Sequence, residues 1–221
     1  MKARTTSGEE NKRIHNPDGN PFAADLPDFA CAEKLRLFEY LPKNIASIFF
    51  LDLDVLVLQN FWDEKNYFEE SSRSLVICPD TFVGYKEKME DEFRPFDPDF
   101  RMKFNPDGSY FYFNTGVFFA SKSLHGKLFL TFLSIWKDYI SSQGKLPSVF
   151  DQNLINYCVI KHGLDVLSLP LQSNCLRQYG AVVENGRLTL NREPVNAYHF
   201  NGGDGDIKRV RWLEFLQKLE V

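Results

Sequence analysis

The stretch "IFFLDLDVLVLQN", residues 48–60, places two carboxylates, Asp52 and Asp54, inside a run of apolar residues. The apolar residues predict a strand within 45–55, at the centre of a sheet that is covered on both faces. In an extended strand, side chains two residues apart point to the same side, so both acids should face one way. Two such carboxylates repel each other in a low-dielectric site, and a divalent cation such as Mg²⁺ or Mn²⁺ would remove that conflict.

A D-x-D pair at a strand end allows more than one function. In nucleotide-sugar transferases the acids hold a metal on the donor diphosphate, whereas in phosphatases of the haloacid-dehalogenase type the first acid, here Asp52, is the nucleophile. A structural alternative is that the chain leaves the sheet at Asp52 and that both acids are solvated or cap a turn.

The rest of the chain alternates predicted strands with predicted helices, which indicates an α/β sheet flanked by helices. Residues 1–28 are polar and aperiodic and predict an arm or loop, and the charged segment 84–108 predicts an excursion over the surface, a candidate lid. Helices are predicted over 29–41, 123–143, 151–163 and 207–220. Strands are predicted over 74–80, 110–120, 165–170 and 195–200, with a hairpin after "ENG" that includes 187–191.

Composition excludes several classes of protein. The chain has 221 residues, 43% of them hydrophobic, and a formal net charge of −4, which argues for a folded core and against nucleic-acid binding. No apolar stretch is long enough to span a bilayer, and the N-terminal residues lack the apolar core of a signal peptide, which slightly favours a cytoplasmic location. The four cysteines are scattered without a C-x-x-C pair, so neither a zinc ribbon nor a redox dithiol is expected.

Three further stretches add chemistry-bearing residues: "FNTGVFFASKS" (113–123), "DQNLIN" (151–156) and "HFNGG" (199–203). Together with "KLRLFEYLPKNIASIFFLDLDVLVLQN", this ordered set resembles glycosyltransferase family 8 and its glycogenin-like relatives, which have the GT-A fold. The resemblance runs from Lys34 to Gly202, roughly three quarters of the chain. Each motif alone is weak, and it is their common order that carries the resemblance.

The resemblance implies a role for each matching residue. Asp52, Asp54 and His199 would bind Mn²⁺ or Mg²⁺. Asp151 and Gln152 would face the donor sugar as the catalytic pair. Residues near the nucleotide-sugar donor would be Lys34, Arg36, Leu53, Asn114, Gly116, Gly202 and Lys208, although Lys208 lies about three residues later than the family's lysine. The plainer alternatives are a helix N-cap for Asp151, a satisfied strand-end histidine for His199, and helix-surface charges for Lys34 and Arg36.

The expected function is therefore a metal-dependent transfer of a sugar, with retention, from a UDP-hexose to a carbohydrate or protein-glycan acceptor. The expected domain is a GT-A-like unit over 29–221, in which the first βαβ nucleotide-binding unit is truncated or missing because few residues precede the helix at 29–41. A transferase remnant without catalysis is the alternative that this truncation raises.

Overall fold

The structure, a computed structural model, describes residues 30–59, 74–81, 83–143, 150–201 and 217. The predicted arm over 1–28 and nearly all of the predicted helix over 207–220 lie outside these residues. The expectation of a shortened first βαβ unit also concerns the N-terminal residues that are outside the description.

A four-stranded mixed sheet forms the centre of the molecule, in the order β1-β4-β3-β5. Its strands are β1 (Ser47–Leu51), β3 (Leu75–Pro79), β4 (Phe113–Ser121) and β5 (Val166–Ser168). β4 runs antiparallel to both β1 and β3, and β3 is parallel to β5. β4 and β3 are the inner strands, and every residue of β4 is buried. Because β1 and β3 point the same way, their carboxyl ends lie at the same edge.

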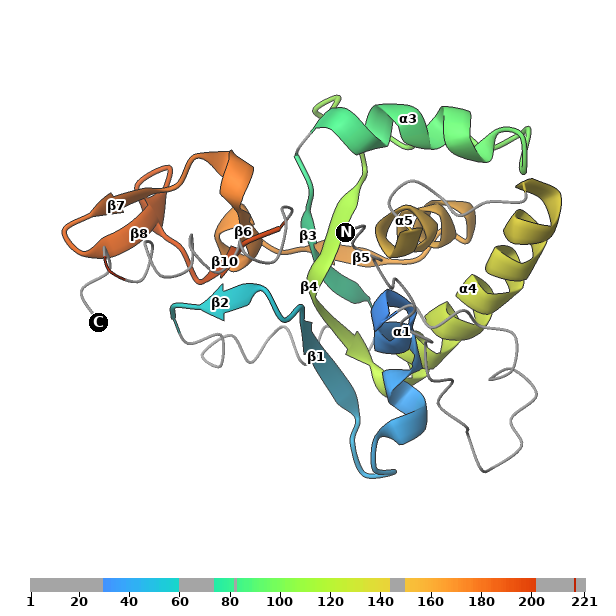
Figure 1. Ribbon diagram of the computed structural model, residues 1–221, viewed down its shortest axis with the longest axis horizontal. Coiled ribbons are helices and arrows are strands. Elements are labelled where there is room, and N and C mark those ends of the chain that lie inside the picture. Colours follow the sequence, from blue (N-terminus) through green and yellow to red (C-terminus); the bar gives the residue numbers. More distant parts are fainter. Residues whose placement is uncertain (1–29, 60–73, 82, 144–149, 202–216, 218–221) are drawn as a thin grey trace, which may run out of the picture.

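Three helices lie on one side of this sheet (Figure 1): α1 (Ala30–Tyr40), α4 (Lys122–Gln143) and α5 (Phe150–Lys161). α1 ends just before Pro42, as expected from the clash between proline and a helical preceding residue. α4 buries Phe129, Phe132 and Trp136 in the main core. The helices predicted over these segments are confirmed. No helix in the described residues has both the length and the apolarity to cross a bilayer.

The prediction of a surface excursion over 84–108 holds for its many exposed residues, but it missed a helix and a contribution to the core. α3 (Val83–Phe93) begins in this segment, and Phe93 and Phe100 are buried in the main core, with the Phe93 ring stacked on Tyr157 at 4.6 Å between centroids. Met89 and Phe93 are four residues apart and so fall on one helix face, a period hidden in the sequence by the surrounding charges. The segment is therefore part of the core and not a lid over it.

Two smaller sheets lie on the other side of the central sheet (Figure 1). One has the order β2-β10-β6, from β2 (Val55–Val57), β10 (Ala197–His199) and β6 (Cys175–Leu176). The other has the order β7-β8-β9, from β7 (Val182–Glu184), β8 (Arg187–Leu190) and β9 (Glu193–Pro194). The predicted hairpin after "ENG" is confirmed: Asn185 and Gly186 have φ of 51° and 73°, as a tight hairpin turn between twisted strands requires.

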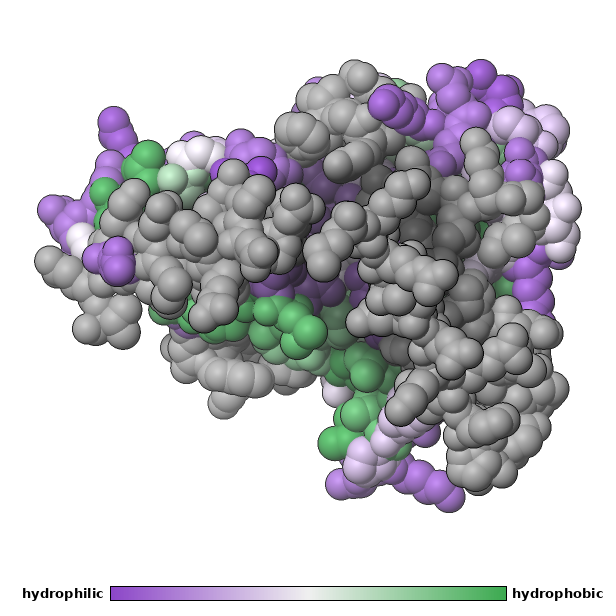
Figure 2. Space-filling model, viewed as in Figure 1, coloured by the Kyte–Doolittle hydropathy of each residue, from purple (hydrophilic) through white to green (hydrophobic). Residues whose placement is uncertain are grey.

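The prediction of one central strand over 45–55 is wrong in two respects. β1 ends at Leu51, and within the described part of the chain it is the edge strand of the central sheet. The next apolar residues, Val55–Val57, form β2 and join a different sheet. Figure 2 shows apolar side chains along this β1 and β2 edge. The predicted fold class, α/β with mixed sheets flanked by helices, is nevertheless confirmed.

Candidate active site

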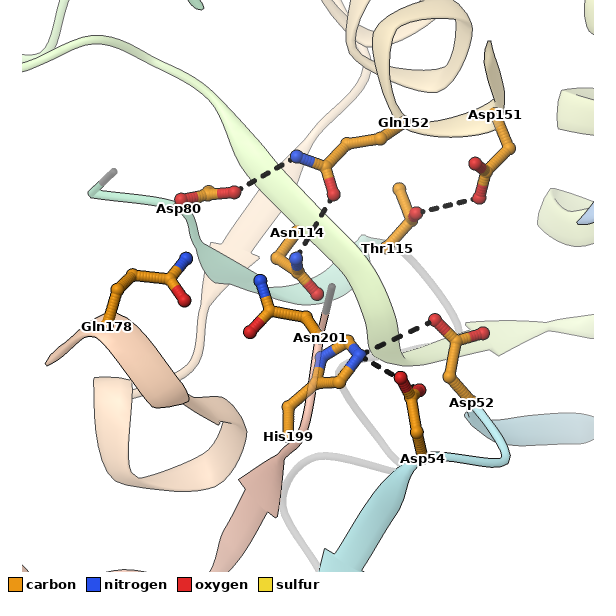
Figure 3. A pocket seen from close by; sticks show the side chains of 10 residues that line it. All are labelled: Asp52, Asp54, Asp80, Asn114, Thr115, Asp151, Gln152, Gln178, His199 and Asn201. Atoms are coloured by element: carbon orange, nitrogen blue, oxygen red, sulfur yellow. Dashed lines mark hydrogen bonds and ion pairs between the residues drawn. The ribbon is translucent and has the colours of Figure 1, made fainter. Parts of the chain in front are cut away.

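Two carboxylates and one imidazole converge at the end of β1 (Figure 3). His199 Nε2 lies 3.2 Å from Asp54 Oδ1 and 4.0 Å from Asp52 Oδ2. One ligand atom from each of the three side chains falls within 4.8 Å of the others, so one divalent ion could contact all three. Carboxylate oxygens with an imidazole nitrogen form a donor set that suits Mn²⁺, and the oxygens also suit Mg²⁺. The residues present therefore fit a divalent metal.

A tight turn, and not an extended strand, brings the two acids together. Asp52 N still donates to Gly116 O of β4 at 2.8 Å, and Val55 N then donates to Asp52 O at 3.1 Å, which closes a turn over residues 52–55. Leu53 sits in this turn with a fully exposed side chain. The sequence predicted that both acids would face one way because they alternate along an extended strand. They do converge, but a turn and not an extended strand is the cause.

The pairing of β2 with β10 holds Asp54 against His199. In this ladder His199 stands opposite Val55, and Phe200 N donates to Asp54 O at 2.9 Å. The acids therefore come from the turn after β1, while the imidazole comes from a strand far along the chain. The backbone ladder fixes their separation before any metal binds.

The metal group lies in a polar cleft of about 270 Å³, close to the size of small-ligand pockets. Four carboxylates are among its lining side chains. In Figure 3, Asp80 lies to the left of Asn114 and the other three lie to its right. The lining residues are Asp52, Asp54, Asp80, Asn114, Thr115, Asp151, Gln152, Gln178, His199 and Asn201. Asn201 Oδ1 is buried and has no hydrogen-bond partner within the described residues, which is an acceptor left over for a ligand.

A buried lysine of α1 stands between the metal group and Asp151. The Lys34 ammonium forms an ion pair with Asp151 and lies 3.8 Å from Asp52 Oδ1. Thr115 Oγ1 accepts from Lys34 and donates to Asp151, both at 3.1 Å. Burial raises the pKa of Asp52, and the Lys34 ammonium opposes this rise. A bound cation would favour the charged form of this carboxylate further.

The side-chain amide of Gln152 connects Asp80 to Asn114 of β4 through hydrogen bonds. Gln152 Nε2 donates to Asp80 Oδ2 at 3.0 Å and to the Tyr112 hydroxyl at 3.1 Å. Gln152 Oε1 accepts from Asn114 Nδ2 at 3.1 Å. All four side chains are buried, so their orientations are fixed by hydrogen bonds that water does not replace. Gln152 therefore stands in a rigid frame beside the cleft.

The structure brings together most of the residues that the sequence singled out. Asn114, Asp151 and Gln152 line the cleft with the metal group, and Lys34 and Gly116 contact side chains of that lining. Arg36 does not line this cleft: it lies two residues from Lys34, roughly 200° around the helix, and pairs with Glu39 at 3.0 Å. Gly202 and Lys208 are outside the described residues.

Several lining residues escaped the sequence analysis. Asp80 had a usable signal, because it follows β3 directly as Asp52 follows β1, and ligands gather at the carboxyl ends of such strands. Thr115 lies within the quoted "FNTGV" and was passed over. Asn201 lies within the quoted "HFNGG" and was likewise passed over, whereas Gln178 lies in a short 3-10 turn (Arg177–Tyr179) that no motif marks.

Comparisons with known proteins bear on the fold. No family model matches the chain, and no curated protein matches it. Among solved structures, the chain is similar to the crystal structure of mouse xyloside xylosyltransferase 1 in its apo form, with a TM-score of 0.53 and 19% sequence identity. The match covers 77% of this chain and 62% of that one, so the chain spans less than two thirds of its neighbour's length. The likeness shows the fold alone, which is GT-A-like.

Proposed function

We propose that this protein is a metal-dependent glycosyltransferase, similar to family 8, that moves a hexose from a UDP-sugar to an acceptor with retention. One observation carries the proposal: in a glycosyltransferase-like fold, Asp52, Asp54 and His199 converge to a metal-sized group beside a polar cleft. The fold favours transfer over the phosphatase alternative, in which Asp52 would be a nucleophile.

The charge of the cleft supports a metal-dependent anionic donor. Its lining includes Asp52, Asp54, Asp80 and Asp151, and a diphosphate would be repelled by four carboxylates in a low-dielectric site. Asp52, Asp54 and His199 would hold Mn²⁺ or Mg²⁺. When bound, the ion would act as a Lewis acid that stabilises the charge on the leaving diphosphate.

The remaining side chains would hold the donor sugar. Asp151 and Gln152 would accept hydrogen bonds from sugar hydroxyls through their side-chain oxygens, because both reach the cleft from the first turn of α5. Lys34 and Thr115 fix the Asp151 carboxylate, and Asn114 fixes the Gln152 amide. Such preorganised polar groups lose little freedom when the sugar binds.

A second cleft supplies a place for the acceptor. It measures about 260 Å³ and shares Gln178 with the first cleft, so the two adjoin. Among the described residues its lining carries no charged side chain and mixes apolar with hydrogen-bonding groups, which suits the two faces of a neutral sugar: Thr81, Leu171, Gln178, Tyr179, Leu190 and Asn191. We place a carbohydrate or glycan acceptor here.

The proposal is tested by ligand-dependent stabilisation of the folded chain. UDP-glucose, UDP-galactose, UDP-xylose and a GDP-sugar are each added with and without Mn²⁺, and the unfolding temperature is measured. At least one UDP-sugar should raise it only when Mn²⁺ is present. Calorimetry should show that Asp54→Asn weakens this binding by more than about 100-fold, since even residues that only orient metal ligands are worth about 10–100-fold.

The matched control is Asp138→Asn, which removes an exposed carboxylate on α4 away from the cleft and should leave binding unchanged. Binding of UDP-sugars that ignores both Mn²⁺ and Asp54→Asn would contradict the metal assignment. Tight Mn²⁺-dependent binding without sugar transfer to any acceptor or to water would support a remnant in place of an enzyme.

A further inference from the structure

A buried asparagine links the imidazole of the metal group to the amide frame of the cleft. Asn174 is the last residue of the 3-10 turn η2 (Leu171–Asn174) and is 1% exposed. Its Oδ1 lies 3.1 Å from His199 Nδ1, and its Nδ2 donates to Asn114 Oδ1 at 2.8 Å. Neither contact involves the ring nitrogen that faces the acids, which is His199 Nε2.

The direction of these hydrogen bonds follows from a backbone group. Gly116 N–H can only donate, and it donates to Asn114 Oδ1 at 2.9 Å, so this atom of Asn114 must be the oxygen. Asn174 must then present its NH₂ group to that oxygen, which turns its own Oδ1 toward His199. An amide oxygen only accepts, so the contact requires a proton on His199 Nδ1.

The hydrogen bonds of Gln152, on the other side of Asn114, lead to the same assignment. Gln152 presents its NH₂ group to the Asp80 carboxylate, so its Oε1 faces Asn114 and accepts from Asn114 Nδ2. An ionised carboxylate only accepts, as the backbone N–H only donates. Two independent anchors therefore assign the same orientation to Asn114 and, through it, to Asn174.

We propose that Asn174 is a positioning residue that keeps a proton on His199 Nδ1 and so leaves Nε2 as the nitrogen that a metal between Asp52 and Asp54 would bind. Gly116 packs directly against the ring, because a Cβ atom at this position would lie 2.3 Å from His199 Cε1. The ring is thus held by a hydrogen bond on Nδ1 and by close packing. The inference rests on the metal site of the proposed function, and not on the identity of the sugar or the acceptor.

The tautomer is measured on the metal-free protein. Long-range ¹H–¹⁵N spectra of the full chain at about pH 8, where an ordinary imidazole is neutral, distinguish protonated from unprotonated ring nitrogens. The His199 signals are identified by their absence from His199→Gln. We expect a protonated Nδ1, and a wild-type protein in which Nδ1 carries no proton would overturn the proposal.

Two substitutions test whether the acceptor oxygen of Asn174, and not merely the size of its side chain, is what matters. Asn174→Ala removes the acceptor, and it should let His199 populate the Nε2–H tautomer and weaken Mn²⁺ binding about 10–100-fold in calorimetry with the metal alone. Asn174→Asp loses the N–H donor to Asn114 Oδ1 but keeps an acceptor for Nδ1–H, so it should keep the proton on His199 Nδ1, which decides the question even where Asn174→Ala fails to fold. The matched control is Asn196→Ala, whose side chain contacts Ser173 and not His199.

Unchanged Mn²⁺ affinity and tautomer in a folded Asn174→Ala would overturn the proposal, as would a shift to Nε2–H in Asn174→Asp. Failure of the proposed function looks different. A protein that shows the expected tautomer and binds Mn²⁺ but transfers no sugar would disprove the reaction and leave the role of Asn174 intact.

Discussion

Gly116 faces the imidazole of His199 so closely that its lack of a side chain is a structural requirement. The position that a Cβ atom would take lies 2.3 Å from His199 Cε1 and 2.8 Å from Nδ1, well inside van der Waals contact. From sequence, this glycine was expected to keep the backbone close to the donor. The structure gives it a nearer neighbour, the candidate metal ligand.

Gly116→Ala should displace the imidazole, because the surrounding residues are buried and cannot move away freely. We expect a loss of about 1–3 kcal/mol in the free energy of unfolding, as for other overpacked cores, and weaker Mn²⁺ binding. Denaturant unfolding and calorimetry measure the two effects.

The control for this prediction is a double-mutant cycle with His199→Ala, which removes the atoms that the new methyl group would strike. The cost of Gly116→Ala should fall in that background, with a coupling of about 0.5–3 kcal/mol. Additive effects would show that the methyl group strains something other than His199.

At the scale of elements, α1 and α4 are joined by a buried histidine. His125 Nε2 lies 2.7 Å from Lys34 O, and its Nδ1 has no partner in the described part of the chain. Burial lowers the pKa of His125, with the hydrogen bond to the Lys34 carbonyl acting in the opposite direction. The imidazole is therefore neutral in the folded protein at a pH where the unfolded chain already binds a proton.

This difference predicts a loss of stability in acid. Above about pH 6.5 neither state binds the proton, and stability does not depend on His125. Below that pH the unfolded state binds more protons, so the free energy of unfolding falls with pH, by up to about 1.4 kcal/mol per unit, until the lowered folded pKa is reached. His125→Gln keeps a donor for Lys34 O but does not titrate. Denaturant unfolding between pH 7.5 and 5.5 should show a shallower fall for His125→Gln, and equal falls would contradict the prediction.

Structural features that depend on neighbouring residues in the sequence were predictable, and features that depend on residues distant in the sequence were not. The "ENG" hairpin was found because Asn185 and Gly186 carry the turn's conformation in their own sequence. The end of β1 was missed because apolar periodicity cannot distinguish one long strand from two short strands that join different sheets. Asn174 was missed because its role depends on contacts with His199 and Asn114, which are distant in the sequence and near only in the folded chain.

At the scale of the whole molecule, the candidate site lies where the central sheet meets the smaller ones. Asp52 and Asp80 follow strands of the central sheet, whereas His199 and the second cleft belong to the later part of the chain. The ordered motifs predicted this convergence, because the resemblance that they carry assigns all of them to one site. The second cleft had no motif, so only the three-dimensional arrangement suggests a separate place for an acceptor.

The division between the two clefts predicts that acceptor binding can be altered without altering the donor. Asn191 lines the second cleft and is not among the described residues that line the first, and its φ is 55°, so Asn191→Gly removes its amide without straining the backbone. Loss of a hydrogen bond worth about 0.5–1.5 kcal/mol should raise the acceptor KM about 2–13-fold, while donor hydrolysis without acceptor stays unchanged. Asn185→Gly is the matched control, since Asn185 has a similar φ of 51° in the β7–β8 turn, outside the cleft. Equal effects of Asn191→Gly on transfer and hydrolysis would place the acceptor elsewhere.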